Sequence, residues 1–196
     1  MATVNELRVA FEIADTEAEG PGRRYAIWLQ GCPMRCPGCC NPEFLPESGG
    51  SLVAVDELAQ RIERTPHIEG VTLLGGEPFF QACPAAALLE KVHRQGRSTM
   101  VFSGYTLAEL ENVPHSRALL ADTDLLVDGR YDRTRPDTTR RWIGSTNQVM
   151  HFLTERYTPS DPVFHTSDTL EIRFRPGLVT INGRPSATLL DGRSPK

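Results

Sequence analysis

Apolar and polar residues alternate over 7–13, near the start of the chain, as they do in a strand with one buried face. An apolar run at 25–30 predicts a second strand, buried on both faces. Shorter apolar runs predict three more buried strands, at 70–74, 99–102 and 124–128. Helix signals separate these strands. They are apolar positions at helical spacing over 55–62, a helix from Pro84 to a stop at Gly96, a capping box at 106–109 and a short helix at 116–121.

This alternation of helix and strand predicts an α/β fold with a parallel sheet covered by helices. The tail has a different pattern, because 170–175 and 178–183 flank Pro176-Gly177 and predict a β-hairpin that closes the fold. Residues 131–168 give poor signals, and we expect an ordered but irregular loop there. With no internal repeat and no long linker, the chain is expected to form a single domain over 1–196.

Composition narrows the function classes. The 196 residues include 25 acidic and 21 basic side chains, so the basic surface that grips phosphates is missing and nucleic acid is not an expected partner. No apolar stretch is long enough to span a bilayer, and residues 1–6 lack the basic and apolar regions of a secretory signal. We therefore expect a cytoplasmic protein with no membrane partner.

Four of the five cysteines lie within nine residues: Cys32, Cys36, Cys39 and Cys40. Because a cytoplasmic chain has little use for structural disulfides, clustered thiols indicate a metal or redox site. Two prolines and two glycines within 31–41 exclude a regular element, so this cysteine loop follows directly on the strand at 25–30.

The spacing Cys-x3-Cys-x2-Cys leaves several chemistries open. Soft thiolate ligands select iron–sulfur clusters or zinc, but a structural zinc requires four ligands. Cys40 is adjacent to Cys39, Cys83 lies in a separate loop, and both are interpreted as small buried residues. Three ligands suit a 4Fe-4S cluster with one open iron. Cys36-Pro37-Gly38-Cys39 also matches a redox dithiol.

A second motif follows the strand at 70–74, where Gly75, Gly76, Glu77 and Pro78 lie at its carboxyl end. This edge of a parallel sheet is where α/β proteins bind ligands. Paired glycines let a ligand approach the backbone, and a carboxylate beside them can pair with an ammonium group. A tight turn alone would also explain the four residues.

Together the two motifs resemble the radical S-adenosylmethionine superfamily, and in particular the small activating proteins of glycyl-radical enzymes such as anaerobic ribonucleotide reductase. Those proteins share Cys-Pro-Gly-Cys followed by Asn, here Cys36 to Cys39 and Asn41. They also resemble this chain at 102–106, 125–129 and 144–148. The resemblance extends from about residue 7 to about residue 183.

The resemblance implies a partial (β/α) barrel and a specific site. Cys32, Cys36 and Cys39 would hold a 4Fe-4S cluster, and the cosubstrate S-adenosyl-L-methionine would bind its open iron. The Gly75-Gly76-Glu77 stretch would bind the methionyl amine. Ser103 and Asp128, at the ends of the next two strands, would help to hold the cosubstrate.

The implied enzyme cleaves S-adenosylmethionine reductively to a 5′-deoxyadenosyl radical, which abstracts a hydrogen atom. Its partners would be an electron donor, flavodoxin or ferredoxin, and a glycyl-radical enzyme. The alternatives left open are a radical enzyme acting on a small molecule or peptide, and a non-enzymatic zinc or iron–sulfur module.

Two further features bear on this choice. Residues 131–168 are expected either to dock a partner, through the arginines that begin at Arg133 and end next to Trp142, or to fold across the barrel mouth as a lid. The five histidines share no ligand spacing and are interpreted as surface residues.

Overall fold

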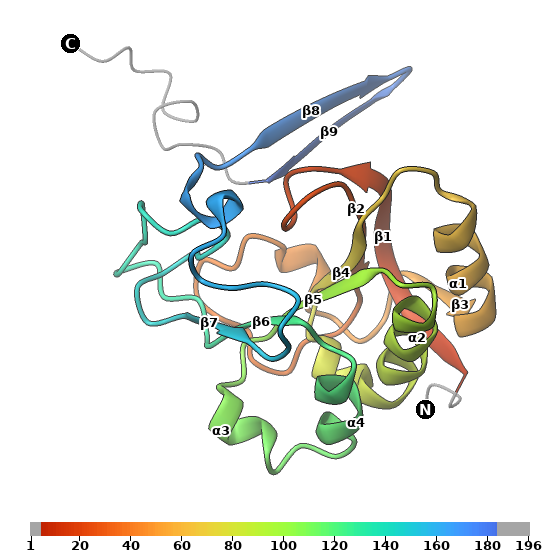
Figure 1. Ribbon diagram of the computed structural model, residues 1–196, viewed down its shortest axis with the longest axis horizontal. Coiled ribbons are helices and arrows are strands. Elements are labelled where there is room, and N and C mark those ends of the chain that lie inside the picture. The colour runs from red at the N-terminus through yellow and green to blue at the C-terminus, as the bar shows by residue number, and fades with distance from the viewer. Residues whose placement is uncertain (1–4, 184–196) are drawn as a thin grey trace.

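A seven-stranded sheet forms the centre of the computed structural model, which describes residues 5–183 (Figure 1). Its strand order is β3-β1-β2-β4-β5-β6-β7. The strands are β1 (Glu6–Thr16), β2 (Arg24–Leu29), β3 (Ser51–Ala54), β4 (Gly70–Gly75), β5 (Ser98–Phe102), β6 (Leu125–Asp128) and β7 (Val149–Phe152). Strands β2, β4, β5 and β6 run parallel, whereas β1, β3 and β7 are antiparallel to their neighbours. The expected α/β fold with a mostly parallel sheet is confirmed.

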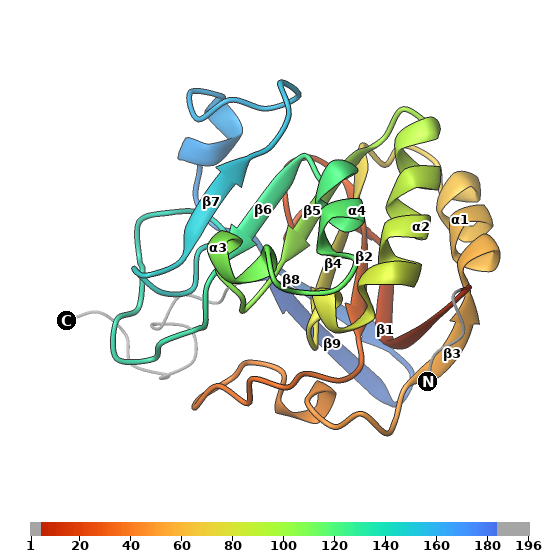
Figure 2. The same cartoon turned by 90° about the horizontal axis from the view of Figure 1, so that it is seen from below.

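Three helices cover one face of the sheet, as Figures 1 and 2 both show. They are α1 (Val55–Arg64), α2 (Ala82–Arg94) and α4 (Ser116–Ala121), and the short α3 (Leu107–Leu110) lies near the end of β6. The apolar positions that predict α1 and α2 are the buried ones: Leu58, Ile62, Leu88 and Leu89 have no exposed surface. They pack on Leu73 and Val101 of the sheet in the main core. The capping box of α3 is present as predicted.

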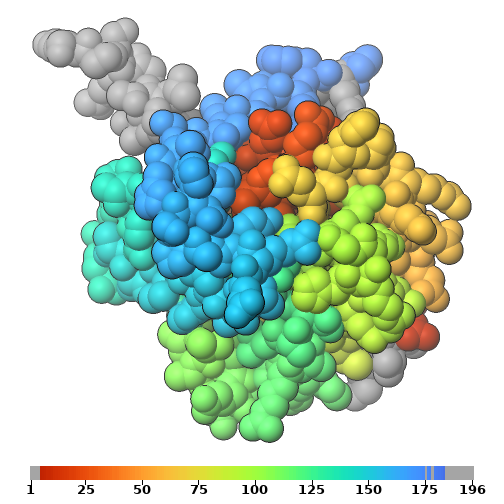
Figure 3. Space-filling model, viewed as in Figure 1, coloured from red at the N-terminus to blue at the C-terminus, as the bar shows by residue number. Residues whose placement is uncertain are grey.

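The segment 131–168 is not wholly irregular, and that expectation is wrong in part. It contains β7, which extends the sheet next to β6, and a 3-10 helix at Pro162–His165. Phe152 and Phe164 of this segment pack on the buried Trp142 and cover the sheet face opposite the helices. Figure 3 shows residues 149–168, in blue, beside the loop that precedes them. Strands β3 and β7 lie at the two edges of the sheet and have mostly exposed or half-buried side chains, so their apolar signal is weaker than that of β6, which is equally short but buried throughout.

The C-terminal hairpin forms at the predicted residues, with β8 (Leu170–Arg175) paired to β9 (Leu178–Gly183). It projects from one side of the sheet (Figure 1). Its polar face holds it to the body, because Glu171 accepts hydrogen bonds from the Thr16 hydroxyl at 2.6 Å and from Glu17 N at 2.8 Å. Large apolar side chains are exposed on its other face: Ile172, Phe174, Val179 and Ile181.

The described strands form an open sheet that ends at β3 and β7, so the partial barrel stays a prediction. Among residues 5–183, no helix has the length and apolar character needed to cross a membrane.

Candidate functional site

The predicted site residues meet at one edge of the sheet. Because β2, β4, β5 and β6 are parallel, their carboxyl ends lie together. The cysteine loop follows β2, the Gly-Gly-Glu stretch ends β4, Ser103 follows β5, and Asp128 is the last residue of β6. Figure 2 shows the cysteine loop, in orange, running along this edge.

The two glycines pack backbone against backbone. Gly75 has a φ of +97°, and a Cβ there would lie 2.7 Å from Trp28 Cα. A Cβ at Gly76 would lie 2.4 Å from the carbonyl oxygen of Gly31, the residue directly before the first cysteine. Glu77 N donates a hydrogen bond to the same Gly31 oxygen at 2.9 Å. The glycines therefore bring the end of β4 onto the start of the cysteine loop.

The Glu77 carboxylate is bonded to protein donors. It is 1% exposed and accepts hydrogen bonds from Phe79 N at 3.0 Å, the Ser103 hydroxyl at 2.9 Å and Gly104 N at 2.8 Å. Burial raises the pKa of Glu77 to about 7, against the opposing effect of these hydrogen bonds. Ser103 Oγ also accepts a bond from Tyr105 N at 3.0 Å. In the described residues, Glu77 and Ser103 thus join the ends of β4 and β5.

Asp128 is also bonded within the protein. Its carboxylate is buried, accepts a hydrogen bond from Leu107 N at 2.6 Å and lies 2.9 Å from His151 Nε2. It therefore holds the first residue of α3 and a side chain of β7. The interpretation of His151 as a surface residue missed this contact. Only the recognition of β7 could have revealed it, since pairing with β6 brings His151 to this edge.

The three thiols expected to hold the cluster are half-buried: Cys32, Cys36 and Cys39. Each sulfur accepts hydrogen bonds from backbone N–H groups. The donors are Met34 and Arg35 for Cys32, Tyr131 for Cys36, and Asn41 for Cys39. Such donors favour thiolate ligands and tune iron–sulfur clusters. No three Cys, His, Asp or Glu side chains within residues 5–183 are placed to hold one metal ion. The three thiolates of a 4Fe-4S cluster bind different irons and need not meet at one point. The residues present fit the cluster.

The remaining two cysteines differ from their interpretation as small buried residues. Cys40 is exposed, and Cys83 is half-buried at the start of α2. The Cys40 thiol donates a hydrogen bond to Cys39, which lowers the pKa of Cys39 to about 6 and raises that of Cys40.

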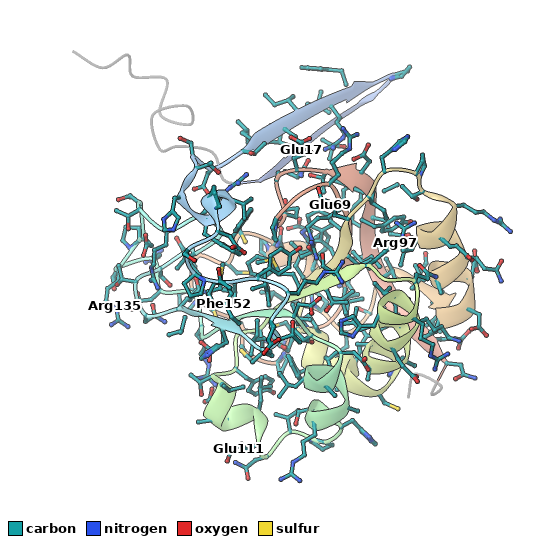
Figure 4. The ribbon with its side chains drawn as sticks, viewed as in Figure 1. Glu17, Glu69, Arg97, Glu111, Arg135 and Phe152 are labelled. Atoms are coloured by element: carbon teal, nitrogen blue, oxygen red, sulfur yellow. The ribbon has the colours of Figure 1, made fainter. Side chains whose placement is uncertain are left out.

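The arginine-rich run is mostly used within the protein. Arg135 and Arg140 pair with aspartates three residues earlier in the chain. Arg141 stacks on Trp142 with its Cζ 4.2 Å from the ring centre. Arg133 makes no hydrogen bond or ion pair with the described residues. Figure 4 shows Arg135 at the outer edge of the molecule, on the loop after β6.

A mostly parallel α/β sheet carries three thiols in a loop at its carboxyl edge, and the match to a family model defines the class as an iron–sulfur protein. Residues 18–151 match the family model described as a 4Fe-4S single cluster domain. The chain is 34% identical over 148 residues to the anaerobic ribonucleoside-triphosphate reductase-activating protein of Vibrio cholerae, covering 69% of this chain and 91% of that protein. The protein of the same name from Escherichia coli K12 is 31% identical to this chain over 145 residues, and the alignment covers 68% of this chain and 91% of the E. coli protein.

The chain therefore belongs to the 4Fe-4S single cluster domain family and is a homologue of the anaerobic ribonucleoside-triphosphate reductase-activating proteins. The resemblance noted in the sequence is confirmed. Among solved structures, Escherichia coli QueE aligns with a TM-score of 0.36 at 18% identity, over 52% of this chain and 53% of that one.

Proposed function

We propose that this protein is a radical S-adenosylmethionine enzyme that activates a glycyl-radical enzyme of the anaerobic ribonucleotide reductase type. The observation that carries the proposal is the contact between its two motifs, because Gly76 packs on Gly31 and so joins the Gly-Gly-Glu stretch to the cysteine loop. The names of the relatives support the same reaction. In this proposal the open sheet is part of the superfamily's partial barrel, within one domain.

Each motif has a role at this edge. Cys32, Cys36 and Cys39 hold the cluster, which when bound supplies the electron that breaks a carbon–sulfur bond of S-adenosylmethionine. Gly75, Gly76 and Glu77 bind the methionyl amine. The half-buried backbone of the glycines faces the cosubstrate, while the buried Glu77 carboxylate holds Ser103 and Gly104 in place. Asp128 supports the next loop by holding the start of α3.

Residues 131–168 favour a protein substrate. Their second half packs towards the amino ends of the strands, where the Tyr157 hydroxyl donates to Ser98 Oγ at 2.8 Å and Arg156 donates to the Gly96 carbonyl at 2.7 Å. That half is therefore occupied away from the cluster edge, and it leaves room there for a large partner. A flavodoxin or ferredoxin would supply the electron, and a reducing compartment, the cytoplasm, suits the free thiols.

The test is anaerobic reconstitution with iron and sulfide, followed by reduction with dithionite and addition of S-adenosylmethionine. We expect a brown protein with about four irons per chain that forms 5′-deoxyadenosine and methionine. A colourless protein with one zinc would refute the proposal. A brown protein that forms no 5′-deoxyadenosine would instead be an electron-transfer module.

A further inference from the structure

The apolar face of the C-terminal hairpin has no part in the proposed reaction. Four large side chains on this face are between 49% and 77% exposed: Ile172, Phe174, Val179 and Ile181. In the antiparallel register Ile172 lies opposite Ile181 and Phe174 lies opposite Val179, so the four side chains form two neighbouring cross-strand pairs. The hairpin lies outside residues 18–151, the part of the chain that matches the family model. The shared 4Fe-4S domain therefore does not account for this face.

The opposite, polar face of the hairpin fixes it to the end of β1 and the turn that follows. Asn182 Nδ2 donates a hydrogen bond to the Thr16 hydroxyl oxygen at 2.9 Å, and Gly183 N donates to the Glu19 carboxylate at 2.8 Å. Figure 4 shows Glu17, on the same turn, next to the hairpin. Because these bonds hold the hairpin in place, its apolar face is presented to solvent in one orientation and needs little ordering before it binds a partner.

The charges of the hairpin indicate what kind of partner fits. Glu171 and Arg173 alternate with the apolar residues of β8, so both lie on the face towards the body, where they form an ion pair with each other. Among the described side chains, the apolar face carries no charge that could select an acidic or a basic partner. A second apolar face of the same shape matches it, and the hairpin of another copy of this chain provides one.

The exposed area indicates how tightly two such faces would associate. The four side chains expose about 450 Å² together, at roughly 200 Å² for each fully exposed large apolar side chain. Two stacked faces would bury about 900 Å², which is more than most crystal contacts bury and less than the roughly 1,200 Å² of stable interfaces. The area therefore favours a reversible dimer over a permanent one.

We propose that two copies of this chain associate by stacking the apolar faces of their hairpins across a two-fold axis, as two sheets pack in a sandwich. A two-stranded ribbon is marginally stable by itself, and the second copy supplies the layer that it lacks. Thr16, to which the hairpin is bonded, pairs with Arg24 at the amino end of β2, whereas the cysteine loop follows the carboxyl end of this strand. The dimer is thus anchored away from the cysteine loop and is independent of the proposed reaction.

The test is sedimentation equilibrium of the full, iron-loaded chain under anaerobic conditions, from about 5 to about 500 μM. A reducing agent excludes dimers linked by a disulfide through the exposed Cys40. We expect a monomer–dimer equilibrium with a dissociation constant of roughly 10–100 μM, as suits an interface of this size.

Substitutions locate the interface. Phe174→Glu should weaken association at least hundredfold, because the dimer would bury a carboxylate without a partner, whereas Phe174→Leu should retain most of it. The matched control is Leu52→Glu, which places the same charge at another exposed apolar position on an edge strand, β3. Iron content, measured for each variant, shows whether it folds and loads as the unaltered protein does.

A chain that stays monomeric at about 500 μM would overturn the proposal. A dimer that Phe174→Glu leaves intact, or that Leu52→Glu weakens equally, would also overturn it. If the chain is monomeric, binding of the dye anilinonaphthalene sulfonate by the unaltered protein but not by Phe174→Glu would show that the face is open to a different partner. No binding of the dye would show that residues 184–196 of the same chain cover the face.

Discussion

Replacing Gly76 by Ala tests whether the glycine motif serves the fold or only the cosubstrate. The new Cβ would lie 2.4 Å from the Gly31 carbonyl oxygen and 2.9 Å from the Leu29 oxygen, closer than real Cβ atoms approach backbone. The end of β4 must then move away from the cysteine loop. That movement lengthens two hydrogen bonds, Gly76 N to Leu29 O at 2.7 Å and Glu77 N to Gly31 O at 2.9 Å.

The cost has two parts. Each lost hydrogen bond contributes about 1 kcal/mol net, and overpacking a tight contact costs about 1–3 kcal/mol more. Gly76→Ala should therefore lower the free energy of unfolding by about 3–5 kcal/mol, a large share of the roughly 5–15 kcal/mol of a typical domain. The matched control is Gly96→Ala. Gly96 has a positive φ, +75°, which Gly76 does not have, and no heavy atom lies within 4 Å of its built Cβ, so the control measures about 1–2 kcal/mol of backbone strain without any steric clash.

The assay is urea unfolding of the reduced apoprotein, without iron and without S-adenosylmethionine. Under these conditions a glycine that only contacts cosubstrate has no effect on stability. Iron uptake during reconstitution gives a second readout, which Gly76→Ala should impair and Gly96→Ala should not. If Gly76→Ala unfolds within about 1 kcal/mol of the control and takes up iron normally, the backbone contact is not what requires glycine.

The remaining predictions concern the other predicted site residues. Alanine in place of Cys32, Cys36 or Cys39, the three proposed ligands, should abolish iron binding in an anaerobic iron assay. Cys40→Ala should retain iron binding. Because the folded pKa of Glu77, about 7, exceeds its ordinary value of 4.5, the fold is stabilised by its protonated form and loses that stability as the pH rises from about 4.5 to about 7. The Gln side chain of Glu77→Gln does not titrate. Urea unfolding of the apoproteins should therefore show that the free energy of unfolding of this variant rises by about 3 kcal/mol relative to that of the unaltered protein between about pH 4.5 and pH 8. A difference between the two proteins that stays constant with pH would contradict this. Asp128→Ala should destabilise the apoprotein by about 1–3 kcal/mol in the absence of cosubstrate, because Leu107 N loses its acceptor. Unchanged stability would mean that Asp128 has only a ligand-binding role.

The elements with strong periodicity were predictable from the sequence. The helix at Val55–Arg64 places its apolar positions in the core, and the hairpin strands begin and end at the expected residues. Strands β3 and β7 were not predictable, because each is an edge strand with mostly exposed or half-buried side chains, and its place depends on pairing with a neighbour in the sheet. The interpretation of 131–168 as irregular failed for this reason.

The site was predictable in position but not in detail. Loops after consecutive parallel strands must meet at one edge, so the order of the strands along the chain is enough to group Cys32, Gly76, Ser103 and Asp128. The hydrogen bonds of Glu77 could not be predicted, since its carboxylate is free to face either a ligand or the neighbouring strand. Residue types indicate which groups are available, whereas the backbone path decides which of them are already paired.

The cysteine loop has no regular structure of its own, so its shape must come from its neighbours. Three strand ends supply contacts: Gly76 after β4 packs on Gly31, Gly104 after β5 packs on Met34, and the loop after β6 packs Arg133 over Gly38. At Gly104 a Cβ would lie 2.2 Å from Met34 Sδ, so glycine again permits the approach. Because three separate strands hold one loop, the thiols are positioned only once the sheet has formed. Cluster assembly should therefore require the folded sheet, and cluster binding should in turn stabilise that edge against local unfolding.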